Sequence, residues 1–129
     1  MEDHRGWTAG DLLCEGVYIV SNKYLIPDEA LGRIRLRDKL CVYCQKEMIF
    51  PYDPKRATDS ATIEHLSPEP PFYCPDMKID NIVICCGACN SSRGTKQLRD
   101  WFRTNYCLEK GICEDKVAQP VKEYLLNLS

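Results

Sequence analysis

Two C-x-x-C pairs, Cys41/Cys44 and Cys86/Cys89, constrain the fold of this chain more than any other feature. Four cysteines at this spacing are typical of a tetrahedral zinc site formed by two short knuckles. Four thiolates complete the coordination sphere and leave no position for water, so we expect a structural rather than a catalytic zinc. The pattern therefore predicts a fold in which residues 41–44 and 86–89 lie side by side.

The nine cysteines of the 129-residue chain also fit two other interpretations, a secreted disulfide framework and a thioredoxin-like redox pair. The cysteine count is odd, the N-terminal MEDHRGW does not resemble a signal peptide, and neither C-x-x-C opens a helix in a βαβ context. We therefore favour zinc. Cys85 is an alternative ligand to Cys86, but Cys86 keeps the two-residue spacing to Cys89.

Hydrophobic periodicity and proline content predict an α+β organisation. We expect helices over 28–40, 88–106 and 117–128, strands over 60–66 and 81–85, a weaker strand over 17–20, and loops over 50–59 and 67–75. The corresponding domain prediction is an N-terminal extension with a helix (1–39), a central domain (40–106) and a C-terminal helical tail (107–129). No apolar run approaches the length needed to cross a bilayer, and we expect a cytoplasmic protein with no membrane partner.

The net charge of −2 argues against a nucleic-acid partner, because phosphate binding normally requires a basic face. The charge is unevenly distributed, however. Basic residues outnumber acidic ones four to one in residues 31–39 and five to two in residues 90–110. These two segments flank the cysteine pairs and predict local basic surfaces, although single charge runs are more often ordinary solvated faces.

His65 is the strongest candidate for a catalytic residue. It ends a predicted strand, follows Glu64 and precedes a loop that contains four prolines. An imidazole titrates near neutral pH and can take a proton from water, as a general base must. Adjacent strand residues point to opposite faces, so Glu64 and His65 would both reach one site only where the strand bends or bulges.

Three segments together resemble the HNH endonucleases of the ββα-metal class: Cys41-Val-Tyr-Cys44, TIEHLSP (62–68) and DNIVICCGACNSSRG (80–94). The resemblance covers residues 40–101, about half the chain. It implies a small ββα-metal core in which a two-stranded ribbon and a helix bind one divalent ion, with the four-cysteine zinc site beside it and helices flanking both.

The resemblance also implies roles for individual residues. His65 resembles the general base, and Asn81 resembles the asparagine that fixes the loop and orients that base. Glu64 and Asn90 resemble the protein ligands of a catalytic Mg²⁺ or Mn²⁺, an ion that prefers oxygen ligands. Basic side chains of the following helix are expected to contact nucleic acid, namely Arg93, Lys96 and Arg99.

Three functions are consistent with these residues. The first is a metal-dependent endonuclease that hydrolyses DNA, with RNA as the alternative substrate, acting as a monomer or a homodimer. The second is a non-catalytic zinc module that binds nucleic acid or protein; it requires only the four cysteines and leaves Glu64, His65 and the two asparagines unexplained. The third is a folded but inactive HNH protein in which Glu64, in place of the commoner aspartate, misplaces the metal.

Overall fold

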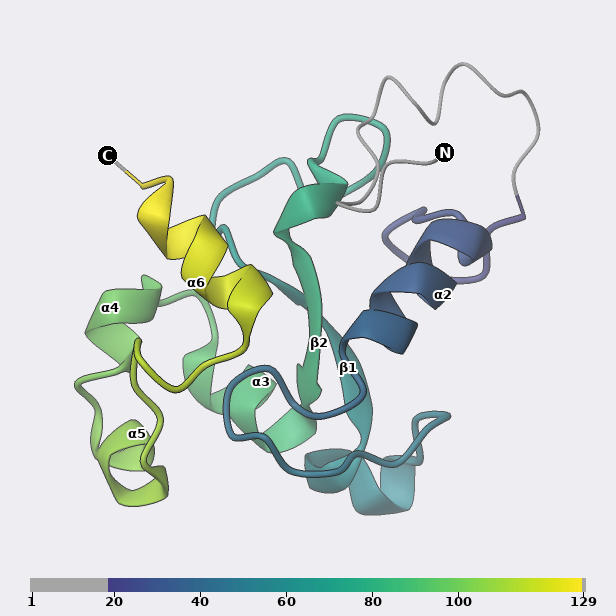
Figure 1. Ribbon diagram of the computed structural model, residues 1–129. Coiled ribbons are helices and arrows are strands. Elements are labelled where there is room, and N and C mark those ends of the chain that lie inside the picture. The colour runs from purple at the N-terminus through teal and green to yellow at the C-terminus, as the bar shows by residue number, and fades with distance from the viewer. Residues whose placement is uncertain (1–18, 129) are drawn as a thin grey trace.

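A two-stranded antiparallel ribbon forms the centre of the protein in the computed structural model, which describes residues 19–128 (Figure 1). Strand β1 (Ala61–His65) pairs with β2 (Ile82–Cys86) so that His65 lies opposite Ile82 and Ala61 opposite Cys86. Both strands lie where the apolar and β-branched runs predict them. The protein is thus a small mixed helix and strand structure, as expected.

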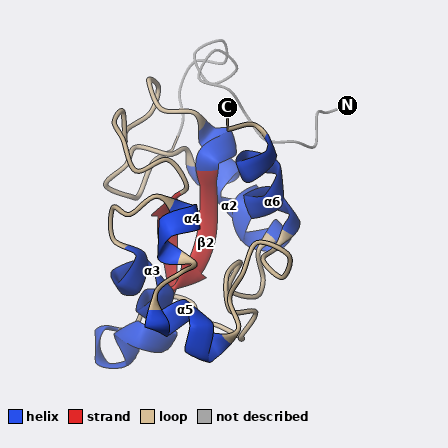
Figure 2. Cartoon of the chain, turned by 90° about the vertical axis from the view of Figure 1, so that its left-hand side faces the viewer, coloured by secondary structure: helices blue, strands red, loops and turns tan. Residues whose placement is uncertain are grey.

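Strand β2 is buried on both faces, and it separates two hydrophobic clusters. Ile82 and Ile84 belong to a cluster with residues of α2 (Asp28–Arg37), while Val83 and Cys85 belong to a cluster with the C-terminal helices. Figure 1 shows α2 on one side of the ribbon and α4 to α6 on the other, and Figure 2 looks onto the side that carries α4 to α6. The continuous apolar run of β2 results from this burial on both sides.

The single helix predicted over 88–106 is wrong, because the chain turns twice within that range. It forms three short helices, α3 (Gly87–Arg93), α4 (Leu98–Trp101) and α5 (Asn105–Lys110). Gly94 ends α3 with φ = 54°, a conformation that side chains with a Cβ rarely adopt. The hydroxyl of Thr104 then accepts a hydrogen bond from the Cys107 N–H and caps α5.

The other predicted helices are present but shorter. Helix α2 ends at Arg37, because the next residue, Asp38, is buried and its carboxylate accepts a hydrogen bond from the Ile84 N–H at 3.0 Å. Helix α6 (Gln119–Leu126) buries Val121 and Leu125 in the hydrophobic cluster that also contains Cys41, Cys86 and Cys89. The C-terminal helix therefore shares one hydrophobic cluster with β2 and the cysteine knuckles.

The remaining segments connect these elements with little regular structure. The predicted loop over 50–59 contains a 3₁₀ helix, η1 (Pro54–Asp59), and a second one, η2 (Ile79–Asn81), precedes β2. Of the strand predicted over 17–20, positions 17 and 18 lie outside the described residues, and Val20 forms one isolated bridge with Pro27. No helix within residues 19–128 is long and apolar enough to span a membrane.

Candidate metal centre and adjoining cleft

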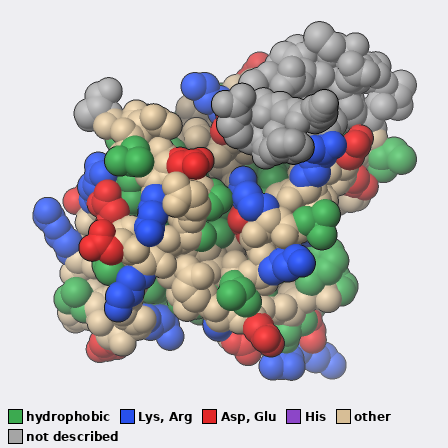
Figure 3. Space-filling view, viewed as in Figure 1, with side chains coloured by type: hydrophobic (Ala, Val, Ile, Leu, Met, Phe, Trp, Pro, Cys, Tyr) green, Lys and Arg blue, Asp and Glu red, His purple; other side chains and the backbone are tan. Residues whose placement is uncertain are grey.

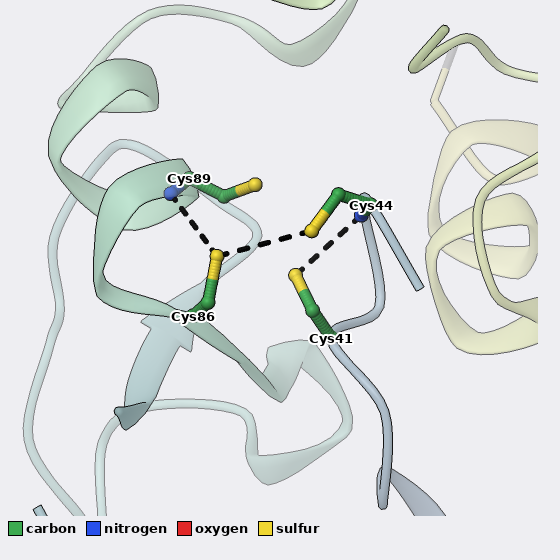
Figure 4. A group of neighbouring side chains, drawn as sticks. All are labelled: Cys41, Cys44, Cys86 and Cys89. Carbon is green, nitrogen blue, oxygen red and sulfur yellow. Dashed lines mark hydrogen bonds between the residues drawn. The ribbon is translucent and has the colours of Figure 1, made fainter. Parts of the chain in front are cut away.

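The side chains of Cys41, Cys44, Cys86 and Cys89 converge on one point (Figure 4). Their four sulfur atoms lie within 4.8 Å of one another, and those of Cys44 and Cys86 are 3.9 Å apart. A tetrahedral zinc with Zn–S bonds of about 2.3 Å separates its sulfur atoms by about 3.8 Å. The cluster can therefore hold a metal such as zinc, and it contains Cys86 rather than Cys85.

Local hydrogen bonds prepare these sulfur atoms for negative charge. The Cys44 N–H points at the Cys41 sulfur at 3.5 Å, and the Cys89 N–H points at the Cys86 sulfur at 3.4 Å. The Tyr106 hydroxyl adds a third donor, 3.3 Å from the Cys89 sulfur. Donors of this kind stabilise thiolates and orient metal ligands. None of the eight cysteines in the described part of the chain forms a disulfide.

The second knuckle also approaches the 3₁₀ helix η1 closely. The Gly87 N–H donates to the Ser60 carbonyl at 3.0 Å, and a Cβ on Gly87 would lie 1.9 Å from the carbonyl oxygen of Ala57. Any side chain at position 87 would clash with this carbonyl, so only glycine fits there.

A cleft of about 330 Å³ lies at the end of β1, and it brings together three of the predicted site residues. His65 and Glu64 reach it from β1, and Asn90 reaches it from α3, directly after the second knuckle. The second C-x-x-C knuckle thus sets where α3 begins and places Asn90 beside the strand. Residues of all three kinds thus line one cavity, but β1 pairs with β2 in unbroken register and has no bulge at Glu64 or His65. The two side chains contact different neighbours, Tyr43 and Arg93 for Glu64 and Tyr24 and Phe72 for His65.

His65 is half-buried and held in one tautomer. Its Nε2 lies 3.1 Å from the carbonyl oxygen of Phe72, which can only accept a hydrogen bond, so Nε2 carries the proton and Nδ1 is left with a lone pair. The ring also packs edge to face with Tyr24 and Phe72. Burial lowers the pKa of His65 below its ordinary value of 6.5; the hydrogen bond to the Phe72 carbonyl opposes this shift, and Lys23 and Arg93 add smaller decreases. The lowered pKa favours the neutral imidazole at pH 7.

Glu64 is part of a buried polar network. Its Oε2 accepts hydrogen bonds from the Tyr43 hydroxyl at 2.6 Å and from the Arg93 guanidinium at 2.8 Å. Burial raises the pKa of Glu64, and the contacts with Arg93 and Tyr43 oppose that rise. The pKa of Tyr43 lies well above 10, mainly because of its own burial, so its hydroxyl stays protonated and remains a donor. Both hydrogen bonds end on Glu64 Oε2, and the other carboxylate oxygen, Glu64 Oε1, takes part in neither.

The two asparagines differ in how they are held. The amide nitrogen of Asn90 donates to Thr62 Oγ1 at 2.9 Å and to the Ile63 carbonyl at 3.1 Å, and its oxygen takes no part in either bond. Asn81 is joined to β1 through its backbone, where its carbonyl accepts from the Leu66 N–H at 2.8 Å. Within residues 19–128 no hydrogen bond joins the Asn81 side chain to His65, and the Phe72 carbonyl orients the imidazole instead.

The three basic residues expected to contact nucleic acid lie in different environments. Arg93 is 1% exposed, and its guanidinium donates to the carbonyls of His65, Leu66 and Lys96 as well as to Glu64, so it is a structural residue and does not reach a surface phosphate. Arg99 is on the surface and forms an ion pair with Glu114 at 2.8 Å. Lys96 is exposed. On the face in Figure 3, basic and acidic side chains are interspersed.

Sequence reasoning missed the residues that support the site. Tyr43 sits inside the first knuckle, but nothing in its spacing indicates a bond to a residue 21 positions away. The Phe72 carbonyl is a backbone group, which leaves no signal in the residue type. Arg93 could be noticed in the sequence, because it is a single arginine directly before Gly94 and close to the second knuckle. Its positive charge, however, predicted an exposed side chain, whereas it is buried.

Comparisons with protein-family models, with curated proteins and with solved structures gave no match to this chain.

Replacing Arg93 by methionine is expected to destabilise the protein by about 3–5 kcal/mol, because it leaves the Glu64 carboxylate buried without its cationic partner. Urea unfolding of the zinc-loaded protein measures this change. Lys96→Met, at an exposed position of the same segment, serves as the control and should change stability by less than about 0.5 kcal/mol. The double variant Glu64→Leu/Arg93→Met should be more stable than Arg93→Met alone; equal stability of Arg93→Met and wild type would contradict the ion-pair role.

Proposed function

We propose that this protein is a metal-dependent HNH-type endonuclease that hydrolyses phosphodiester bonds in DNA, with a structural zinc in the four-cysteine cluster. The observation that carries the proposal is the position of the His65 imidazole, whose Nε2 is held by the Phe72 carbonyl in a cleft that Glu64 and Asn90 also line. An orienting acceptor on one ring nitrogen and a lone pair on the other are what a general base requires.

In the proposed reaction, Nδ1 of His65 takes a proton from a water that attacks the phosphorus. The Phe72 carbonyl fixes the ring and stabilises the imidazolium that forms, as a hydrogen-bond acceptor. Arg93 acts as a positioning residue, since its guanidinium binds the carbonyls of His65 and Leu66 at 2.9 and 2.8 Å and holds the end of β1 in place. Cleavage in this direction leaves a 5′-phosphate and a 3′-hydroxyl.

Glu64 and Asn90, which line the cleft, would supply the oxygen ligands that Mg²⁺ or Mn²⁺ prefers. Glu64 Oε1 and the Asn90 side-chain oxygen are outside the hydrogen bonds that fix these two residues. A divalent ion held by them would stabilise the charge that develops on the phosphate and the leaving 3′ oxygen. Because Arg93 already pairs with Glu64, we expect weak ion binding that strengthens when a substrate phosphate adds negative charge.

The test of this proposal is cleavage of supercoiled plasmid by the purified, zinc-loaded protein. We expect nicking or linearisation when Mg²⁺ or Mn²⁺ is added and none without it, because the hydrolysis needs a cation next to the leaving oxygen. Ca²⁺ at the same concentration provides the ionic-strength control. Cleavage that continues at the same rate in EDTA, with the zinc retained, would argue against this chemistry.

The pH dependence of cleavage follows from the lowered pKa of His65. The base must be neutral, so activity is present above the folded-state pKa and is lost as the pH falls through it, with a midpoint below 6.5. Measuring kcat/KM from about pH 5 to 8 gives this midpoint for the free enzyme. Lys23 lowers the pKa of His65, so Lys23→Gln should move the midpoint upward. An acid limb centred above 6.5 would contradict the base assignment.

A second candidate function is a zinc-stabilised module that binds nucleic acid without cutting it. The buried Glu64–Arg93 pair favours it, because a carboxylate already paired with a cation is a weaker metal ligand. This module would bind DNA in gel-shift assays and leave the plasmid intact at every metal concentration. The plasmid experiment therefore separates the two functions.

A further inference from the structure

The cleft beside His65 is lined by aromatic rings from two loops. Tyr24 comes from the loop before α2, and Phe72 and Tyr73 come from the proline-rich loop after β1. The Tyr24 ring packs edge to face on His65, with 4.4 Å between ring centroids, and lies 6.1 Å from the Tyr73 ring. Tyr73 is 54% exposed. An aromatic side chain is thus open to solvent at the mouth of the candidate active site.

A positive charge accompanies these rings. Lys23 is exposed and lines the same cleft, and its Nζ lies 5.2 Å from the centroid of the Tyr24 ring. The nearby carboxylate, Glu64, is buried and paired with Arg93, so it does not neutralise Lys23. Ring faces next to an exposed ammonium match the two parts of a nucleotide, because bases stack on aromatic side chains and phosphates attract cations.

We propose that the cleft takes an unstacked base of a single-stranded nucleic acid, with Tyr73 as the stacking platform and Lys23 on the adjacent phosphate. Base faces in a duplex are covered by their neighbours, so only a single strand or a displaced nucleotide can use an exposed ring. Lys23 is the one Lys or Arg among the described residues that line the cleft, which suits a single phosphate better than the several phosphates that a duplex footprint presents. This inference rests on the proposed nuclease function and names its substrate class.

The experiment measures binding separately from cleavage. Fluorescence anisotropy of a labelled oligothymidine and of a blunt duplex of equal length is recorded with zinc-loaded protein and no added Mg²⁺ or Mn²⁺. We expect the single strand to bind more tightly than the duplex, and Tyr73→Ala to weaken single-strand binding about tenfold. Tyr73→Phe keeps the ring face and should bind like wild type. Leu126→Ala, at a 77% exposed position on α6, controls for loss of a surface side chain.

Lys23→Gln supplies a second, independent readout. It should reduce the slope of log affinity against log salt by about 0.7, the value for one phosphate contact on a single strand. An unchanged slope, or single-strand affinity equal in Tyr73→Ala and wild type, would overturn the inference. These outcomes are distinct from failure of the nuclease proposal: Tyr73-dependent binding without metal-dependent cleavage of either the plasmid or the oligothymidine refutes only the nuclease, and metal-dependent cleavage that is unaffected by Tyr73→Ala refutes only the stacking site.

Discussion

His65→Ala is expected to reduce the rate of plasmid cleavage by about 10²–10⁴-fold, the usual contribution of a positioned general base. The variant loses the Nδ1 lone pair that takes the proton from water in the proposed reaction. It also leaves the Phe72 carbonyl without its 3.1 Å partner, but that carbonyl borders an open cleft where water can replace the imidazole. We therefore expect the loss of activity to exceed any loss of stability by a wide margin.

Single-turnover cleavage with Mn²⁺ measures this effect, with circular dichroism and zinc content to verify the fold. His4→Ala removes the other histidine of the chain and is the matched control. Exogenous imidazole should restore part of the activity of His65→Ala if the cleft admits it. If His65→Ala cuts the plasmid as fast as wild type, the assignment of His65 as the base fails. If the His65→Ala protein has lost zinc and unfolded, His65→Gln is the smaller change and is measured in the same assay.

Replacing Cys41 by serine is expected to unfold the protein. Structural zinc sites contribute about 10–16 kcal/mol of apparent binding free energy, which is as large as the whole stability of a typical domain. In this protein the four-cysteine cluster joins Cys41 and Cys44 to Cys86 at the end of β2 and Cys89 in the first turn of α3. All four sulfur atoms take part in the cluster, and the C-terminal helix α6 packs against the same core. Losing one ligand therefore removes the support of both the ribbon and the tail.

Thermal unfolding followed by circular dichroism, with zinc content measured by mass spectrometry, checks this prediction. Cys113→Ser is the matched control, because Cys113 is partly exposed and lies outside the cluster. It should retain zinc and unfold at the temperature of the wild type. Titrating wild type with a zinc chelator should reproduce the Cys41→Ser behaviour. A zinc-free Cys41→Ser protein that unfolds at the wild-type temperature would refute the structural role of the metal.

The elements and sites that depend on short stretches of chain could be predicted from the sequence. The two C-x-x-C pairs indicated the metal cluster because ligand spacing within a knuckle is a local property, and the structure places all four sulfur atoms together. The β-branched runs indicated β1 and β2 within one residue at each end. His65 was singled out for the same reason, since it stands at the end of a strand next to a carboxylate and a proline-rich loop, and the structure places it in a cleft.

Tertiary structure alone decided which polar groups became partners. Arg93 was expected on the surface, but folding brings it to Glu64, 29 residues earlier, and to the carbonyls at the end of β1. Once α3 covers the ribbon, those groups lose water and must find hydrogen bonds within the protein, and a guanidinium supplies several donors at once. The break at Gly94, the Phe72 carbonyl on His65 and the aromatic cleft depend in the same way on how the loops pack, which no short stretch of residues encodes.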